Sequence, residues 1–381
     1  MTKRRAVLRI ALVGAGMLVA IELALHVLDV RPPSPAGYPE GLYVGAPGGG
    51  WALAPDFTGE MAGEPPIEIR TNPGGFRDAP FEPKAPGVFR IVALGDSFGF
   101  GHGVEVDAAY PDLLEQMLST PERPVEVLNL GVPGYNTQME LAQLRRLGAE
   151  LEPDLVLLGL YLGNDPSCNL ERRSPPPRPR FGVLVAAGLD EPEWQVTLRA
   201  FTLKHSLIAR NLRAWWRERK LNAVKDSDGG VLGAVCENLG WDAGQALDLF
   251  LAEPTDDARE AMDRTEAALR ELATEARGLD AELAVALLPA PLQYAPAFLA
   301  FAHESCGIDP ADYDVDRPNR ALGDAGARDG YPVLDLTPIF RARQTADPSK
   351  LLFADVHFNA AGHALAAQEM AMFLLELGLV E

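Results

Sequence analysis

The chain has 381 residues, of which 47% are hydrophobic, enough for one large domain or two ordinary ones with a substantial core. Its formal net charge is −20, and the body of the chain has no concentrated run of Lys and Arg. Because binding to nucleic-acid phosphates needs a concentrated basic surface, this composition argues against a nucleic-acid partner and is typical of an acidic protein surface.

Residues 1–30 have the pattern of a membrane-targeting segment. Four basic residues within the first nine precede an apolar stretch at 10–30, which only Glu22, His26 and Asp29 interrupt. The stretch is long enough to cross a bilayer as a helix, and the basic cluster would leave the rest of the chain outside the cytoplasm. We expect an uncleaved signal anchor and an extracytoplasmic location. A cleaved signal peptide is the main alternative, although no clear A-x-A site follows the stretch, and a buried helix is the third.

Residues 31–87 are rich in Pro and Gly and contain short alternating runs at 50–54 and 67–71, with a turn at 72–75. This pattern predicts a stalk followed by a small β-hairpin module.

A regular alternation of apolar runs and helical patterns begins at residue 88 and continues to the C-terminus. Short continuous apolar runs predict buried parallel strands at 89–94, 125–130, 155–160, 283–288 and 333–336. Apolar residues spaced three and four apart predict helices at 109–119, 138–150, 259–277 and 360–377. The domain at 88–381 is therefore expected to be α/β, with an open parallel sheet and helices on both faces.

Two stretches interrupt the alternation, at about 166–255 and 291–330. The first contains the segment R-R-S-P-P-P-R-P-R and a helical pattern around 198–221, and the second is mostly helical. Ligands bind at the carboxyl ends of parallel strands, so insertions leaving those ends are candidates for lids and substrate walls.

Two short segments some 260 residues apart together contain the parts of a hydrolytic triad. Ser97 lies in I-V-A-L-G-D-S-F-G, on a Gly-flanked turn directly after an apolar run, where its hydroxyl can be exposed at the end of a strand. Asp355 and His357 lie in A-D-V-H-F-N, close enough for one loop to hold a carboxylate that orients the imidazole. These types of residue predict a nucleophile, an acid and a base.

The loops after the second and third strands contain candidate donors for a developing oxyanion. N-L-G-V-P-G-Y-N-T places Gly134 after the second strand, and Y-L-G-N-D places Asn164 after the third. The amides of Ser97 and Gly134 and the side chain of Asn164 are the expected oxyanion hole.

Other polar residues are given structural roles. We expect a structural role for His363. His102 is expected to support its loop, although it could instead line the pocket. Asp335 is expected to brace a loop, although it could instead serve as an alternative acid. The spacing of His357 and His363 suits no common zinc pattern, so we expect neither metal nor cofactor. The three cysteines, Cys168, Cys236 and Cys306, allow one disulfide or none.

The G-x-S-x-G pattern at 95–99 also matches the elbow of α/β-hydrolases. That elbow normally follows several strands, and its acid and base lie on separate loops, whereas Ser97 follows the first strand of the sheet. The position of Ser97 therefore argues against that fold.

The four blocks G-D-S, N-L-G-V-P-G, G-N-D and D-V-H occur in the order of the SGNH/GDSL hydrolase family, and the chain resembles its bacterial membrane-anchored branch from about residue 88 onward. The resemblance implies a flavodoxin-like three-layer α/β/α fold and a serine esterase that works through an acyl-enzyme on an ester or acylated carbohydrate. The D-x-H spacing resembles that of envelope-polysaccharide O-acetyltransferases, which makes acetyl transfer an alternative. An inactive anchored scaffold or glycan-binding protein is the non-enzyme alternative.

Overall fold

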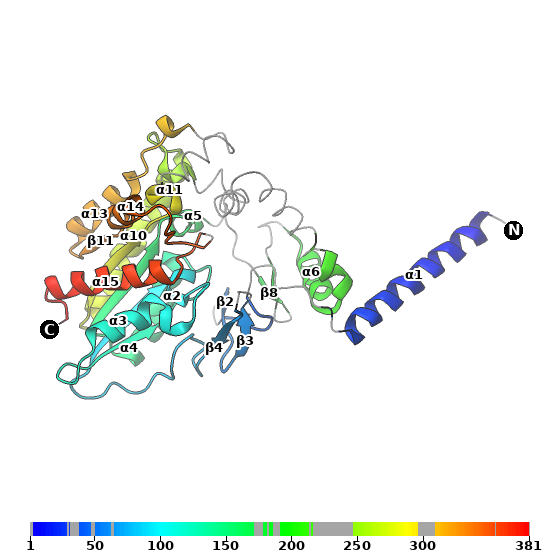
Figure 1. Cartoon of the computed structure of the whole chain (residues 1–381), viewed down its shortest axis with the longest axis horizontal. Coiled ribbons are helices and arrows are strands. Elements are labelled where there is room, and N and C mark those ends of the chain that lie inside the picture. The colour runs from blue at the N-terminus through cyan, green and yellow to red at the C-terminus, as the bar shows by residue number, and fades with distance from the viewer. Residues whose placement is uncertain are drawn as a thin grey trace.

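The computed structural model describes residues 3–28, 30, 38–46, 50–61, 65–170, 178–180, 183–185, 191–212, 215, 247–295, 309–354 and 356–380. Its centre is a five-stranded parallel sheet with the strand order β11-β10-β7-β5-β6 (Figure 1). The strands are β5 (Phe89–Gly95), β6 (Val125–Asn129), β7 (Leu155–Tyr161), β10 (Glu282–Leu288) and β11 (Val333–Asp335). The predicted parallel α/β fold and its five strands are confirmed.

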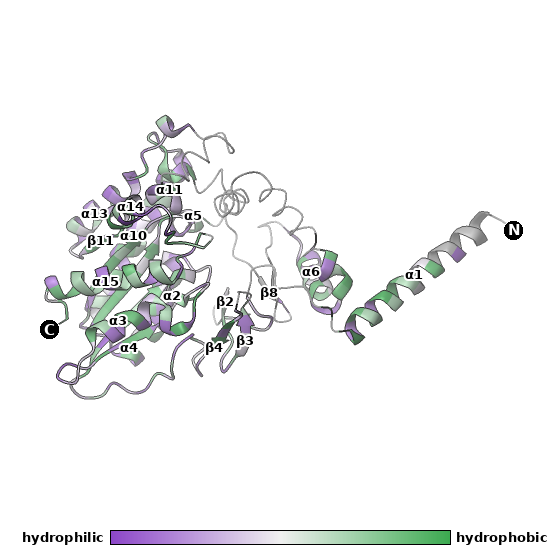
Figure 2. Ribbon diagram, in the orientation of Figure 1, coloured by the Kyte–Doolittle hydropathy of each residue, from purple (hydrophilic) through white to green (hydrophobic). Residues whose placement is uncertain are grey.

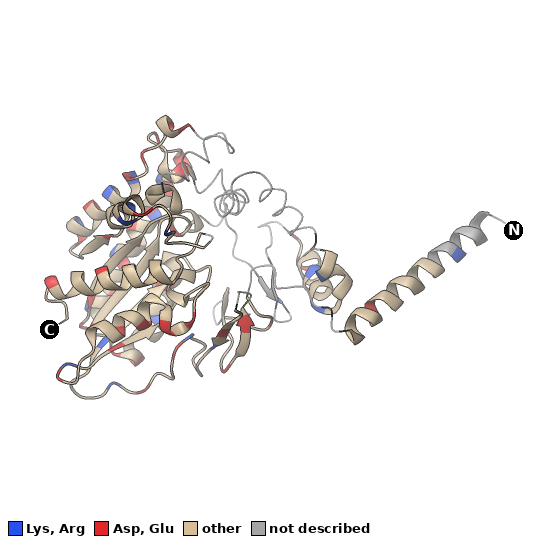
Figure 3. Ribbon diagram, in the orientation of Figure 1, with Lys and Arg blue, Asp and Glu red and all other residues tan. Residues whose placement is uncertain are grey.

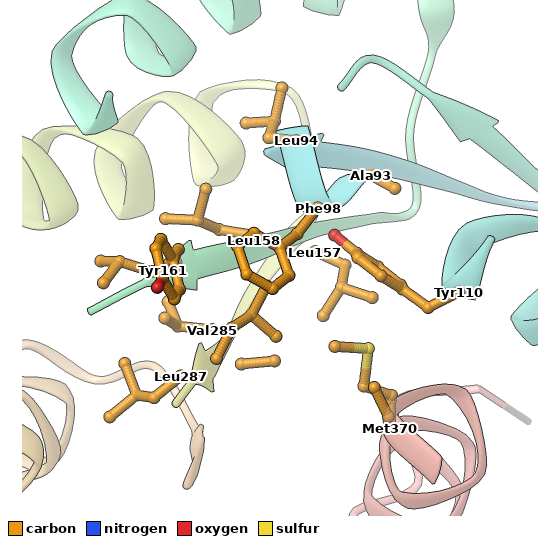
Figure 4. Close-up of a cluster of buried hydrophobic side chains, with 14 of the residues drawn as sticks. Ala93, Leu94, Phe98, Tyr110, Leu157, Leu158, Tyr161, Val285, Leu287 and Met370 are labelled. Carbon is orange, nitrogen blue, oxygen red and sulfur yellow. The ribbon is translucent and has the colours of Figure 1, made fainter. Parts of the chain in front are cut away.

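Every residue of β7 is buried, and β5 and β10 are buried along nearly all of their length. Strands covered on both faces need apolar side chains at successive positions, which explains why they appear in the sequence as continuous apolar runs. Figure 4 shows the centre of this core, where Leu157 and Leu158 of the sheet lie near Phe98, Tyr110 and Met370.

Helices cover both faces of the sheet. The helices α3 (Tyr110–Leu118) and α15 (Ala360–Glu376) pack against each other, as do α4 (Thr137–Leu151) and α10 (Asp256–Gly278). Right-handed crossovers place α3 on one face and α4 and α10 on the other, because the chain leaves β5 toward β6 and then returns past β5 to β7 and β10. The four helices predicted at 109–119, 138–150, 259–277 and 360–377 are confirmed.

The insertion predicted at 291–330 includes a helix that belongs to the α/β core. Helix α13 (Arg317–Asp329) packs on β11 and on α10, so it is the crossover helix between β10 and β11 rather than part of an insertion at 291–330. A crossover is required there because β10 and β11 are parallel neighbours. The other helical elements between β10 and α15 are α11 (Pro291–Tyr294), η4 (Pro310–Asp312) and α14 (Thr337–Ala346).

Two small antiparallel sheets precede the α/β domain. In the first, β1 (Tyr43–Gly45) pairs with β2 (Trp51–Leu53), and in the second, β3 (Thr58–Met61) pairs with β4 (Ile67–Arg70). The runs at 50–54 and 67–71 thus belong to separate hairpins.

Helix α1 (Lys3–Val27) contains most of the apolar stretch near the N-terminus, and Figure 2 shows its predominantly hydrophobic colouring. Its Glu22 carboxylate accepts hydrogen bonds from the Ser206 hydroxyl and from the amides of Leu207 and Ile208. Within the described part of the chain, no helix has both the length and the apolar character needed to span a membrane.

The stretch at 166–255 is described in part. It includes α5 (Asp165–Cys168), the hairpin of β8 (Arg178–Arg180) and β9 (Val183–Val185), α6 (Glu193–His205) and η3 (Leu247–Phe250). Most of the predicted Pro-Arg segment and the end of the helix predicted around 198–221 lie outside the described residues, as do Cys236 and Cys306, so the disulfide question stays open. Figure 3 shows acidic and basic residues interspersed over the helices of the α/β domain.

Candidate active site

Ser97 begins a short helix, α2 (Ser97–Phe100), at the carboxyl end of β5. The carboxylate of Asp96 caps this helix by accepting a hydrogen bond from the Phe98 amide at 2.8 Å. Gly101 ends the helix in the left-handed conformation, with φ of 79°, which glycine adopts without strain. The turn holds Ser97 at 7% exposure, at the edge of the sheet where the sequence predicted it.

His357 lies within hydrogen-bond reach of Ser97. The imidazole Nε2 is 2.8 Å from the serine Oγ, although the two residues are 260 positions apart. A bridge between Phe353 and Phe358 closes the loop that carries His357, and Asn359 caps α15 directly after it by accepting from the amides of Ala361 and Gly362. The loop is therefore held at both ends, which fixes the side from which the imidazole approaches.

Asp355 lies outside the described residues, so its role as the acid stays a prediction. Asp335, weighed in the sequence as an alternative acid, is engaged elsewhere. One of its oxygens accepts hydrogen bonds from the Asn319 side chain at 2.7 Å and from the Thr337 amide at 2.9 Å. These contacts give Asp335 the loop-bracing role.

The two loops with the predicted oxyanion donors lie on either side of Ser97. The strand β5 lies between β6 and β7, so the loop after β6 passes on one side of Ser97 and the loop after β7 on the other. Gly134, in the first loop, has φ of 83°, and Asn164, in the second, directly precedes α5 at its N-cap position. The side-chain oxygen of Asn164 is buried without a hydrogen-bond partner in the described structure, and the donor that an oxyanion would need is the Nδ2 group of the same amide.

Asn129 connects the loop after β6 to the nucleophile turn. Its side-chain amide donates to the Gly99 carbonyl at 2.8 Å, and its side-chain oxygen accepts from the Gly131 amide at 2.9 Å. The motif that begins at Asn129 predicted a role for Gly134 but not this role for Asn129. The available signal was an asparagine at the last position of a buried strand, where a polar side chain needs partners.

Three buried carboxyls, Asp96, Glu140 and Asp165, form a cluster next to the nucleophile turn. All three are fully buried and act on one another electrostatically, and the Tyr110 hydroxyl lies within the same field. Burial raises the pKa of each carboxyl, and repulsion by Asp96 raises the pKa values of Glu140 and Asp165 further. The raised pKa values favour the neutral forms of Glu140 and Asp165, while Asp96 itself accepts a hydrogen bond from Ser97 Oγ at 3.3 Å.

The other two histidines near the site differ in their surroundings. His363 is fully buried, and its Nδ1 accepts from the Tyr110 amide at 3.3 Å. Burial lowers the pKa of His363 to about 3, so the ring is neutral at ordinary pH, in agreement with a structural role. The ring of His102, expected only to support its loop, lies against His357 with 4.1 Å between ring centroids.

The described residues contain no group of three His, Cys, Asp or Glu side chains arranged to hold a metal ion.

No protein-family model matches the chain. A search of curated proteins finds 34% identity to an arylesterase of Vibrio mimicus over 71 residues, which is 19% of this chain and 36% of that protein. The chain therefore matches about a third of the length of this curated relative.

Solved structures with a similar fold include an acetyl xylan esterase, at 12% identity and a TM-score of 0.42, covering 75% of this chain and all of that one. TesA has 13% identity and a TM-score of 0.40, covering 76% of this chain and 99% of its own. A putative lipolytic protein of the G-D-S-L family from Desulfitobacterium hafniense has 12% identity and a TM-score of 0.37, covering 74% and 98%. The curated relative and these solved structures thus include proteins named as esterases and one named as a member of the G-D-S-L family.

Proposed function

We propose that this protein is a serine-dependent ester hydrolase that works through an acyl-enzyme, with an acylated carbohydrate as the substrate class. The observation that carries the proposal is the 2.8 Å contact between Ser97 Oγ and His357 Nε2 at the carboxyl end of β5. A hydroxyl in that position has a base within reach and, on either side, a loop with a candidate oxyanion donor.

In the proposed reaction, His357 Nε2 takes the hydroxyl proton as Ser97 Oγ attacks the ester carbonyl carbon. The carbonyl electron pair moves to oxygen, and this oxyanion is held by the amides of Ser97 and Gly134 and by the Asn164 side chain, each donor being worth about 2.7–4 kcal/mol. Collapse expels the alcohol, which takes the proton from His357. Water, deprotonated by the same imidazole, then attacks the acyl carbon. The bond from this carbon to Ser97 Oγ breaks, the acid leaves, and His357 returns the proton to Ser97.

The cluster of buried carboxyls supports this assignment. Negative charge develops on the substrate oxygen close to Ser97, and ionised carboxylates nearby would oppose it. Burial keeps the pKa values of Glu140 and Asp165 well above the ordinary range, which favours their neutral forms.

The test is the hydrolysis of an activated acetate ester by the full-length chain and by Ser97→Ala. We expect turnover by the first and only the uncatalysed background with the second. Equal rates for the two proteins would contradict the esterase and favour a scaffold or glycan-binding protein that keeps the fold without turnover.

Acetyl transfer is the second candidate, because the D-x-H spacing of Asp355 and His357 resembles that of polysaccharide O-acetyltransferases. In that reaction a sugar hydroxyl replaces water in the second step. Incubation with a labelled acetyl donor and a polysaccharide acceptor separates the two, because only a transferase moves the label onto the polysaccharide.

We also propose that the chain works outside the cytoplasm, attached to the membrane through its N-terminal segment. The basic residues before the apolar stretch support this orientation. Protease added to intact spheroplasts should digest the α/β domain while a cytoplasmic marker stays intact, and protection of the domain until lysis would contradict the proposal.

A further inference from the structure

A chain of contacts runs from Tyr38, which precedes the first hairpin, to the imidazole of His357. Tyr38 Oη and His102 Nδ1 lie 2.7 Å apart in a hydrogen bond, and their rings pack edge to face. The His102 ring lies on the His357 ring, with 4.1 Å between centroids and 32° between planes. Phe98, in the nucleophile turn, also contacts the imidazole, at 5.2 Å between centroids. Two neighbouring rings thus pack against the imidazole of His357, and Tyr38 is hydrogen-bonded to one of them.

A second contact from the same segment reaches the loop after β6. The indole Nε1 of Trp51 donates to the Pro133 carbonyl at 3.1 Å, and the Tyr135 hydroxyl donates to the Trp51 carbonyl at 2.8 Å. The indole also lies so close to Gly134 that an added Cβ there would be 3.2 Å from its ring. Trp51 is 3% exposed, so these hydrogen bonds are shielded from water.

The contact with Pro133 acts on Gly134 because both belong to one peptide group. The Pro133 carbonyl and the Gly134 amide share a planar unit, and in the trans form the C=O and N–H bonds point in opposite directions. Fixing the direction of the carbonyl therefore fixes the direction of the Gly134 N–H, which is the expected oxyanion donor. The turn that contains this peptide group is also closed by a hydrogen bond from the Tyr135 amide to the Val132 carbonyl at 3.0 Å, and a positive φ at Gly134 is the conformation that glycine adopts at this position of such a turn.

We infer that residues 38–46 and 50–53, although they lie outside the parallel sheet, position the catalytic groups. Tyr38, acting through His102, orients the imidazole of His357, and Trp51 orients the amide of Gly134. The inference rests on the proposed esterase function and extends it, because it assigns positioning residues to a part of the chain that the four sequence blocks do not include.

The experiment measures kcat and KM for an activated acetate ester with full-length Trp51→Phe, Tyr38→Phe and His102→Ala. Each kcat is divided by the number of sites that a fluorophosphonate labels, so that misfolded protein does not count. Tyr331→Phe is the matched control. It removes a buried hydroxyl without a hydrogen-bond partner in the described structure, next to the amino end of β11 and thus at the opposite edge of the sheet.

We expect Trp51→Phe and His102→Ala to lower kcat roughly 10- to 100-fold with KM changed by less than about twofold, because misplaced groups impair the transition state more than substrate binding. Tyr38→Phe should lower kcat roughly 3- to 10-fold, the equivalent of one hydrogen bond. In the His102→Ala background the same change should have no further effect, because Tyr38 acts through that ring. Tyr331→Phe should behave as the wild type.

Wild-type kcat in both Trp51→Phe and His102→Ala would overturn the inference, and so would a raised KM at unchanged kcat. If Tyr38→Phe lowered kcat by the same factor in the wild type and in the His102→Ala background, the proposed chain of contacts would be wrong. A wild-type protein that is neither labelled nor active would instead contradict the proposed function itself, so the two failures are distinguishable.

Discussion

Gly131 lies where the loop after β6 passes closest to the nucleophile turn, and the site has no room for a side chain. A Cβ added there would be 2.3 Å from the Phe100 amide nitrogen and 2.5 Å from the Gly99 carbonyl carbon. Both neighbours are backbone atoms of α2 or its immediate turn, so neither can rotate away. Gly131→Ala must therefore push the loop and the turn apart by about 0.7 Å to restore a 3.0 Å contact.

The displacement acts on the spacing between Ser97 and the oxyanion donors. A shift of about 1 Å in a reacting group costs roughly 100-fold in rate, so we expect Gly131→Ala to lower kcat about 10- to 100-fold. Overpacking should also lower the free energy of unfolding by about 1–3 kcal/mol. The assays are steady-state hydrolysis of an activated acetate ester and unfolding in urea.

Gly323→Ala is the matched control for this substitution. Gly323 lies within α13, and an added Cβ there meets no atom within 4 Å. Alanine is the better helix former, so this variant should keep the wild-type kcat and gain about 0.5–1 kcal/mol of stability. A Gly131→Ala variant with kcat within twofold of the wild type would refute the argument that the close approach of loop and turn sets the catalytic geometry.

Three further predictions concern single side chains. Asn164→Ala should lower kcat roughly 10²–10³-fold at nearly constant KM in ester hydrolysis, and a loss confined to KM would contradict a role in the oxyanion hole. Burial raises the pKa of Glu140, because the folded state favours the protonated carboxyl. The stability that this preference contributes is fully present below about pH 4.5, and it is lost as the pH rises through the pKa of the folded state. Glu140→Gln should therefore raise Tm more at pH 8 than at pH 5, and equal Tm shifts at the two pH values would argue against the buried, protonated carboxyl. The pKa of His363 is lowered to about 3, so the wild type loses stability as the pH falls from 6.5 toward 3. His363→Asn keeps an acceptor for the Tyr110 amide and should make Tm, measured by thermal unfolding, depend less on pH in this range.

The sheet was predictable because its strands are buried on both faces, which leaves continuous apolar runs in the sequence. The crossover helix α13 was assigned to an insertion because it is rich in small and charged residues, R-P-N-R-A-L-G-D-A-G-A-R-D, and has few large apolar positions. Only its packing on β11 reveals its place.

The positions of Ser97 and His357 followed from short motifs at the ends of predicted elements. The contacts of Tyr38, His102 and Trp51 did not, because they join segments that are distant in sequence and depend on how the first hairpin and the residues before it pack on the loops. Glu140 was within reach of sequence reasoning. It lies on the buried face of α4 with Leu141 and Leu144, and a carboxyl at a core position signals a perturbed pKa.

The most direct test of the central claim is the covalent labelling of Ser97 itself. The full-length chain is treated with a fluorophosphonate, and peptide mass spectrometry locates the adduct in the wild type and in His357→Ala. We predict one adduct, on Ser97, formed at least about 100-fold more slowly in His357→Ala because the base is missing. An unlabelled Ser97 in the wild type, or equal labelling rates in the two proteins, would contradict the account.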